Sequence, residues 1–129
     1  LSAAEDAVKN MTDQGLERLR QIQAAQREDL SNYNVDEFIR HDREFHSCIY
    51  EMSLNRELMK LASNYYDVFR FLGMQVVMGT EERRLTTIEE HQDILEAMEQ
   101  HNPKAAVQAM KKHMEQTETN IRRHIKIAP

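Results

Sequence analysis

Residues 42–46 read Asp42-Arg43-Glu44-Phe45-His46. They place a carboxylate and an imidazole four residues apart, so both side chains lie on one face of a helix. Apolar side chains recur on the same face, at Phe38, Phe45, Ile49 and Met52. An ionised carboxylate on a buried face is unfavourable unless it is paired or binds a metal. The stretch therefore predicts a core-facing helix whose aspartate has a partner elsewhere in the chain.

The composition favours a single helical domain. The chain has 129 residues, of which 40% are hydrophobic and 30% charged, with only three glycines and two prolines. Its formal charge of −5 argues against direct binding to a phosphate backbone. The lone Cys48 cannot form a disulfide framework. Because no signal peptide or membrane-spanning run is visible, we expect a cytoplasmic protein without a membrane partner.

Capping signals and apolar spacing divide the chain into about six helices, which predicts an all-α antiparallel bundle. Thr12, Asn34 and the pair Asn102-Pro103 are the expected starts of three of them. Thr80 to Thr86 reads as a charged loop, and Thr87 to Glu90 as a capping box that opens the fifth helix. The expected helices are 1–11, 12–30, 34–53, 56–78, 87–101 and 103–125.

Three of the six histidines lie on inward faces of their helices, namely His46, His91 and His113. Any one alone would more often be a hydrogen-bonded core histidine than a metal ligand. As a set with Asp42 they come from three helices of one bundle, and bundles build metal sites from facing helices in this way. Imidazole and carboxylate suit borderline divalent metals. The sequence thus predicts one divalent ion held by Asp42, His46, His91 and His113, whereas His41 should face solvent, His101 lies at a helix end, and the position of His124 stays open.

The sequence leaves two alternatives to a binding site. An ion with open positions can activate water, so a mononuclear metalloenzyme of the hydrolase or lyase type is one of them. Against it, the sequence offers no inward acid or base beyond the ligands, because Glu44 and Glu90 are expected to point elsewhere. No zincin motif and no Glu three residues before a His is present. The other alternative is a structural metal, or a metal-free bundle with Asp42 paired to an arginine.

Three segments resemble the C-terminal ligand-sensing (FCD) domain of FadR-type GntR transcription regulators, in its metal-binding branch. They are Asp42-Arg43-Glu44-Phe45-His46, Glu90-His91-Gln92-Asp93-Ile94-Leu95-Glu96-Ala97-Met98 and Ala106-Val107-Gln108-Ala109-Met110-Lys111-Lys112-His113. The corner from Asn55 to Leu58 is also similar, and the resemblance covers nearly the whole chain.

The resemblance implies a helical sensor domain over residues 1–129 that holds a divalent ion, with zinc ahead of nickel or manganese. It also implies a small carboxylate effector, a homodimer, and DNA binding through an N-terminal winged helix-turn-helix domain that this chain lacks. We expect the first sensor helix to be truncated before Leu1. An anionic effector needs a cation or neutral donors near the ion, and the candidates are Arg70, Tyr66, Thr117 and Asn120.

Overall fold

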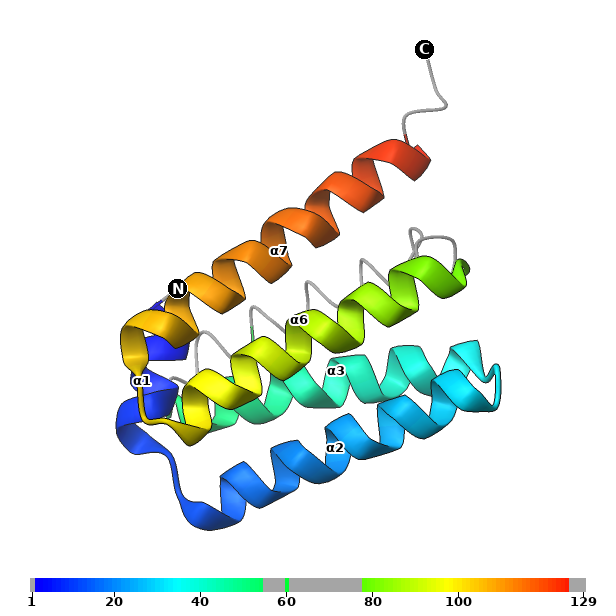
Figure 1. Ribbon diagram of the computed structural model, residues 1–129. Helices are drawn as coiled ribbons and strands as arrows, with labels where there is room; N and C mark the ends of the chain where they lie inside the picture. The colour runs from blue at the N-terminus through cyan, green and yellow to red at the C-terminus, as the bar shows by residue number, and fades with distance from the viewer. Residues whose placement is uncertain (1, 55–59, 61–77, 126–129) are drawn as a thin grey trace.

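The computed structural model describes residues 2–54, 60 and 78–125 of the chain. These residues form five helices and no strand, which confirms the predicted all-α bundle (Figure 1). The helices are α1 (Ser2–Asn10), α2 (Asp13–Ser31), α3 (Val35–Met52), α6 (Glu81–Glu99) and α7 (Pro103–Ile125). About six helices were expected. The one predicted over 56–78 lies outside the described residues, apart from Lys60 and Met78.

Three helices begin where the sequence predicted, because a side chain caps each of them. The Thr12 hydroxyl accepts a hydrogen bond from the Gly15 amide at 3.0 Å. Asn34 does the same for the Glu37 amide at 3.2 Å, and Asn102 for the Ala105 amide at 3.1 Å. Each cap satisfies one of the backbone donors that a helix start leaves without an internal partner.

The predicted start of the fifth helix is wrong. Helix α6 begins at Glu81 rather than at Thr87, and its N-cap is Thr80, whose hydroxyl accepts a hydrogen bond from the Arg83 amide at 3.2 Å. Two glutamates in the first turn favour this start, because negative charge is stabilised at a helix N-terminus. Thr87 is fully buried in the middle of the helix. Residues expected in a charged loop therefore lie on a helix, and two of them, Arg83 and Arg84, are buried.

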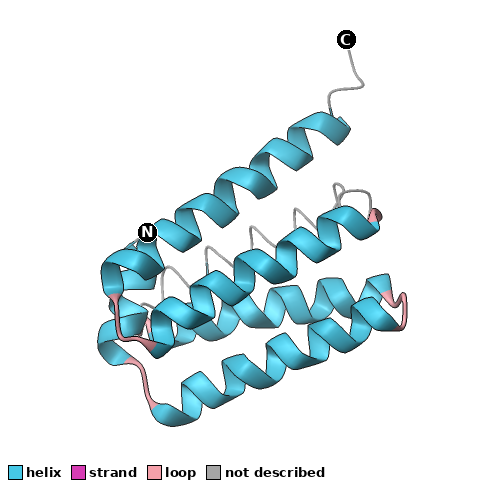
Figure 2. Cartoon of the chain, in the orientation of Figure 1, coloured by secondary structure: helices cyan, strands magenta, loops and turns pink. Residues whose placement is uncertain are grey.

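The helices form two antiparallel hairpins, as the short loops predicted. Helices α2 and α3 make one hairpin and α6 and α7 the other, each joined by a short loop (Figure 2). Helix α2 packs against α6, whereas α1 packs against both α3 and α7. No described helix is both long enough and apolar enough to cross a membrane.

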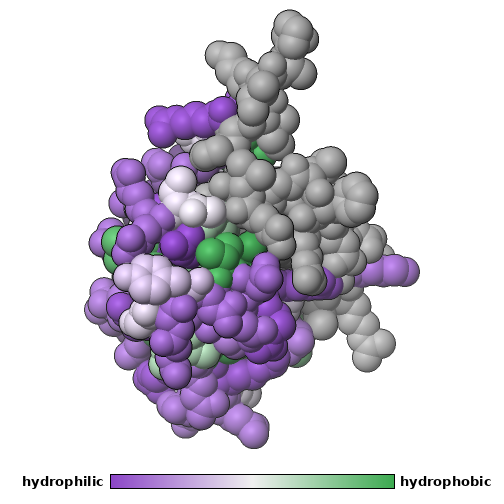
Figure 3. Space-filling model, turned by 90° about the vertical axis from the view of Figure 1, so that its right-hand side faces the viewer, coloured by the Kyte–Doolittle hydropathy of each residue, from purple (hydrophilic) through white to green (hydrophobic). Residues whose placement is uncertain are grey.

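Two apolar clusters fill the interior. The larger contains Phe45, Ile49, Ile94 and apolar residues of α1, α2 and α7, whereas the smaller contains Phe38, Met78 and Ile88. On α3, Asp42 lies between the residues of the two clusters, and on α6 His91 does so. The polar centre therefore sits where the two clusters meet, inside a bundle whose visible described face is mainly hydrophilic (Figure 3).

The turn between α2 and α3 contains a strained residue, which gives a first prediction. Tyr33 is 72% exposed and has a φ of 56°, in the left-handed region that disfavours L-residues by about 1–2 kcal/mol. After the larger backbone entropy of glycine is subtracted, Tyr33→Gly should raise the free energy of unfolding by about 0.5–1 kcal/mol. Urea denaturation measures this.

Asn32→Gly is the matched control, since Asn32 precedes Tyr33 but has an ordinary φ of −92°. That substitution relieves no strain and should lower stability. Equal effects of the two substitutions would contradict the strain at Tyr33.

Candidate metal centre

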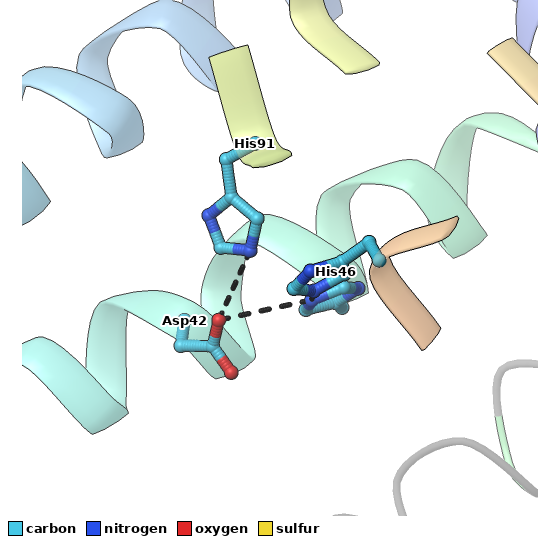
Figure 4. A group of neighbouring side chains, drawn as sticks. Asp42, His46 and His91 are labelled. Atoms are coloured by element: carbon cyan, nitrogen blue, oxygen red, sulfur yellow. Dashed lines mark hydrogen bonds and ion pairs between the residues drawn. The ribbon is translucent and has the colours of Figure 1, made fainter. Parts of the chain in front are cut away.

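Four buried side chains from three helices meet at one point. Asp42 and His46 come from α3, His91 from α6 and His113 from α7, and one donor atom from each lies within 4.8 Å of the other three. Figure 4 shows Asp42, His46 and His91 pointing toward one another. The structure therefore brings together the four residues that the sequence singled out.

The donor atoms are close enough to share one cation. The Nε2 atoms of His46 and His113 are 3.0 Å apart, and Asp42 Oδ1 lies 3.1 Å from His91 Nε2 and 3.7 Å from His46 Nε2. Two ligand atoms that each lie about 2.0–2.1 Å from an ion, with a right angle between the two metal–ligand bonds, are roughly 2.9 Å apart. All four residues are at most 2% exposed.

The outer nitrogens of two histidines have hydrogen-bond acceptors that set their tautomers. His91 Nδ1–H donates to Gln26 Oε1 at 2.9 Å, and the Gln26 amide nitrogen donates in turn to the Phe38 carbonyl. His113 Nδ1–H donates to Glu90 Oε1 at 2.7 Å. A ring whose single proton is on Nδ1 directs its Nε2 lone pair at the shared point.

Two atoms at this point lack a hydrogen bond from any described residue. They are Asp42 Oδ1 and His91 Nε2, which lie 3.1 Å apart but are not aligned as donor and acceptor. Buried polar atoms without hydrogen bonds are uncommon and call for an explanation such as an ion. A divalent cation fits these residues because it would satisfy both atoms at once.

The charges also suit a cation. Burial lowers the pKa of both His46 and His91, and the pKa of His46 lies well below the ordinary value for histidine. The Asp42 carboxylate raises both pKa values but offsets the effect of burial only in part. Burial opposes the ionisation of Asp42, but the surrounding imidazoles outweigh burial and lower its pKa. At neutral pH the centre thus presents a carboxylate and at least two neutral imidazoles, the forms that bind metals.

Glu90 corrects the sequence analysis, which placed it away from the site. It is 5% exposed, accepts the hydrogen bond from His113, and receives two further hydrogen bonds from Arg83 at 3.1 and 3.2 Å. Burial raises the pKa of Glu90, but the hydrogen bonds from His113 and Arg83 lower it by more than burial raises it. The carboxylate is therefore ionised at neutral pH. The missed signal was the spacing of Arg83 and Glu90, two helical turns apart on one face once α6 begins at Glu81.

The predicted effector contacts are only partly described. Tyr66 and Arg70 lie outside the described residues. Thr117 Oγ1 donates to the His113 carbonyl at 2.8 Å and accepts from Arg83 at 3.1 Å, so its one hydroxyl proton is engaged within the protein. The Asn120 amide donates to the Gln116 carbonyl. An effector role for these four residues stays a prediction.

The remaining histidines lie away from this centre or are not described. The expectation that His41 faces solvent is wrong, because its side chain is only 14% exposed and its Nδ1–H donates to Asp29 at the end of the α2–α3 hairpin. His101 is exposed at the end of α6, as predicted. The side chain of His124 lies outside the described residues.

Comparison with known proteins identifies the family. A sequence model of the FCD domain matches residues 1–116. The chain therefore belongs to the FCD domain family, which confirms its resemblance to the ligand-sensing domain of GntR-type regulators. A search of curated proteins finds no match to the chain.

The pKa shifts predict how the stability of the metal-free protein depends on pH. The unfolded state binds protons at His46 and His91 near pH 6.5, whereas the folded state binds them only at lower pH. Stability should therefore be complete above pH 6.5 and fall below it, by up to about 1.4 kcal/mol per pH unit for each histidine. Urea denaturation with chelator between pH 7.5 and 5.5 measures the slope.

His46→Gln should reduce this slope, because it removes one of the two groups. His101→Asn is the control, since His101 is exposed and asparagine tolerates its positive φ of 52°. A slope unchanged by His46→Gln would show that His46 does not titrate abnormally.

Proposed function

We propose that this chain is the metal-dependent, small-carboxylate-sensing domain of a bacterial transcription regulator. The observation that carries the proposal is the convergence of Asp42 Oδ1 with three histidine nitrogens in the bundle interior. Membership of the FCD domain family supports a sensing role. The proposed metal ligands are Asp42, His46, His91 and His113.

The donor set favours one divalent ion, with zinc ahead of nickel or manganese. Three imidazoles and a carboxylate match the ligand preference of zinc, and nickel also accepts nitrogen donors. A bound ion would supply Lewis acidity and open coordination positions for a carboxylate. The protein's own part is to hold four buried donors from three helices in place.

The effector is proposed to be a small organic acid that binds on the open side of the ion. Tyr66, Arg70, Thr117 and Asn120 are the candidate contacts. Thr117 and Asn120 follow His113 on α7, one and two turns further along. In the arrangement described here the Thr117 hydroxyl would have to leave the His113 carbonyl before it could donate to an anion.

Regulation would act through DNA contacts outside this chain. We propose a cytoplasmic homodimer whose N-terminal winged helix-turn-helix domains bind the operator. An effector can change DNA affinity only if it binds one dimer arrangement more tightly than another.

A regulatory role is favoured over catalysis. Among the residues that the structure describes, Glu90 is the buried acid beyond the proposed ligands, and its carboxylate is engaged by His113 and Arg83. Family membership points the same way, because FCD domains are regulatory.

Metal binding is tested by elemental analysis and by thermal melts with zinc or chelator. Ligand that binds only the folded state stabilises it by about 2.7 kcal/mol at a hundredfold excess over Kd. Asp42→Asn should abolish most of this gain, because it removes the only proposed anionic ligand, while leaving the metal-free protein folded.

Asp93→Asn is the matched control, since Asp93 is exposed on α6. It should respond to zinc like the unaltered protein. Absence of zinc, nickel or manganese stabilisation in the unaltered protein would refute the proposed function.

Effector class is tested by titrating citrate, lactate and gluconate against the melting temperature of the metal-loaded protein. The acids should stabilise the loaded protein but not the metal-free one, and their neutral esters should have no effect. Stabilisation that is independent of metal would contradict binding at the ion.

A further inference from the structure

A buried ion pair lies directly behind the candidate metal centre. Arg83 and Glu90 are 4% and 5% exposed, and the guanidinium donates to both carboxylate oxygens at 3.2 and 3.1 Å. One of these oxygens, Oε1, also accepts from His113 Nδ1–H at 2.7 Å. Arg83 itself donates to α7 as well, to the Thr117 hydroxyl at 3.1 Å.

Stability alone gives little reason for this pair. Desolvation of two charges offsets much of their attraction, so a buried pair often adds no net stability compared with apolar residues of similar size. The contact with His113 supplies a different role, because it controls which nitrogen of that ring carries the proton.

The position of the His113 ring proton matters because the other ring nitrogen, Nε2, faces the proposed metal ligands. His113 Nε2 lies 3.0 Å from His46 Nε2 and belongs to the group of four converging donors. A proton on Nε2 would occupy the lone pair that a metal needs. The Glu90 carboxylate keeps the proton on Nδ1, and the two hydrogen bonds from Arg83 fix the carboxylate in that position.

His91 and His113 differ in the group that accepts the hydrogen bond from Nδ1–H. His91 has a neutral amide oxygen, that of Gln26, and its ring is stacked on Phe45 with centroids 4.0 Å apart. His113 has an ionised carboxylate instead. A carboxylate behind an imidazole raises the basicity of the ring as a ligand, which an amide does to a smaller extent.

We propose that Glu90, held in place by Arg83, is the positioning residue that fixes the tautomer of His113 and thereby sets the affinity of the centre for a divalent metal. The proposal rests on the metal-binding function proposed above and deepens it. Neither residue is a ligand. Both act through His113.

The first test reads the tautomer in metal-free protein by nitrogen-15 NMR of the histidine rings at pH 8. The unaltered protein should show His113 with its proton on Nδ1. In the double variant Arg83→Met/Glu90→Met, which removes the acceptor and leaves no buried charge unpaired, the proton should move to Nε2. Arg83→Met/Glu90→Gln retains an amide oxygen as acceptor and should keep the proton on Nδ1.

The second test measures zinc affinity of the same proteins by competition with a chromophoric chelator. Arg83→Met/Glu90→Met should bind zinc about tenfold to a hundredfold more weakly, the range typical when the outer partner of a ligand is lost. Arg83→Met/Glu90→Gln should fall between this variant and the unaltered protein. The control is Arg18→Met/Glu51→Met, an exposed pair 2.8 Å apart that links α2 and α3, and its zinc affinity should not change.

The outcomes separate the two proposals. Unaltered zinc affinity or an unchanged Nδ1–H tautomer in Arg83→Met/Glu90→Met would overturn the role of Glu90. If that variant does not fold, Arg83→Met/Glu90→Gln decides, since affinity equal to that of the unaltered protein would overturn it equally. Failure of the unaltered protein to bind any divalent metal would instead refute the proposed function, and the tautomer measurement would still test Glu90.

Discussion

The buried carboxylate of Asp42 is the constraint on which the centre depends. It lies on α3 between two apolar clusters and is only 2% exposed, so water cannot compensate its charge. Three imidazoles from three different helices surround it, and two of them are in turn hydrogen-bonded to residues on α2 and α6. The Asp42 carboxylate is thus surrounded first by imidazoles and then by the side chains that accept hydrogen bonds from two of those imidazoles.

The sequence predicted the parts of this arrangement that depend on local spacing. Asp42 and His46 are one turn apart within an apolar stripe, and both are buried as that stripe required. Caps at Thr12, Asn34 and Asn102 fixed three helix starts, since each signal acts within four residues. The family resemblance then followed from the three quoted segments, and the FCD domain match confirms it.

What the sequence did not reveal depends on contacts between helices. Thr87 to Glu90 matches a capping box, so the sequence predicts a helix start at Thr87, whereas α6 begins six residues earlier, at Glu81. The same pattern predicts a loop at Arg83, which instead lies on α6. Gln26 continues the apolar stripe of α2, but only its contacts with Phe38 and His91 show why a polar side chain is buried there.

The distribution of the four donors over the two hairpins has a mechanical consequence. His46 and His113 are separated by 67 residues of chain, yet their nitrogens nearly touch. Any ion held between them is a reversible cross-link that closes a long loop, and the entropy that such a link removes from the unfolded chain grows with the logarithm of loop length. The α2–α3 and α6–α7 hairpins could then slide past each other only after the link is broken.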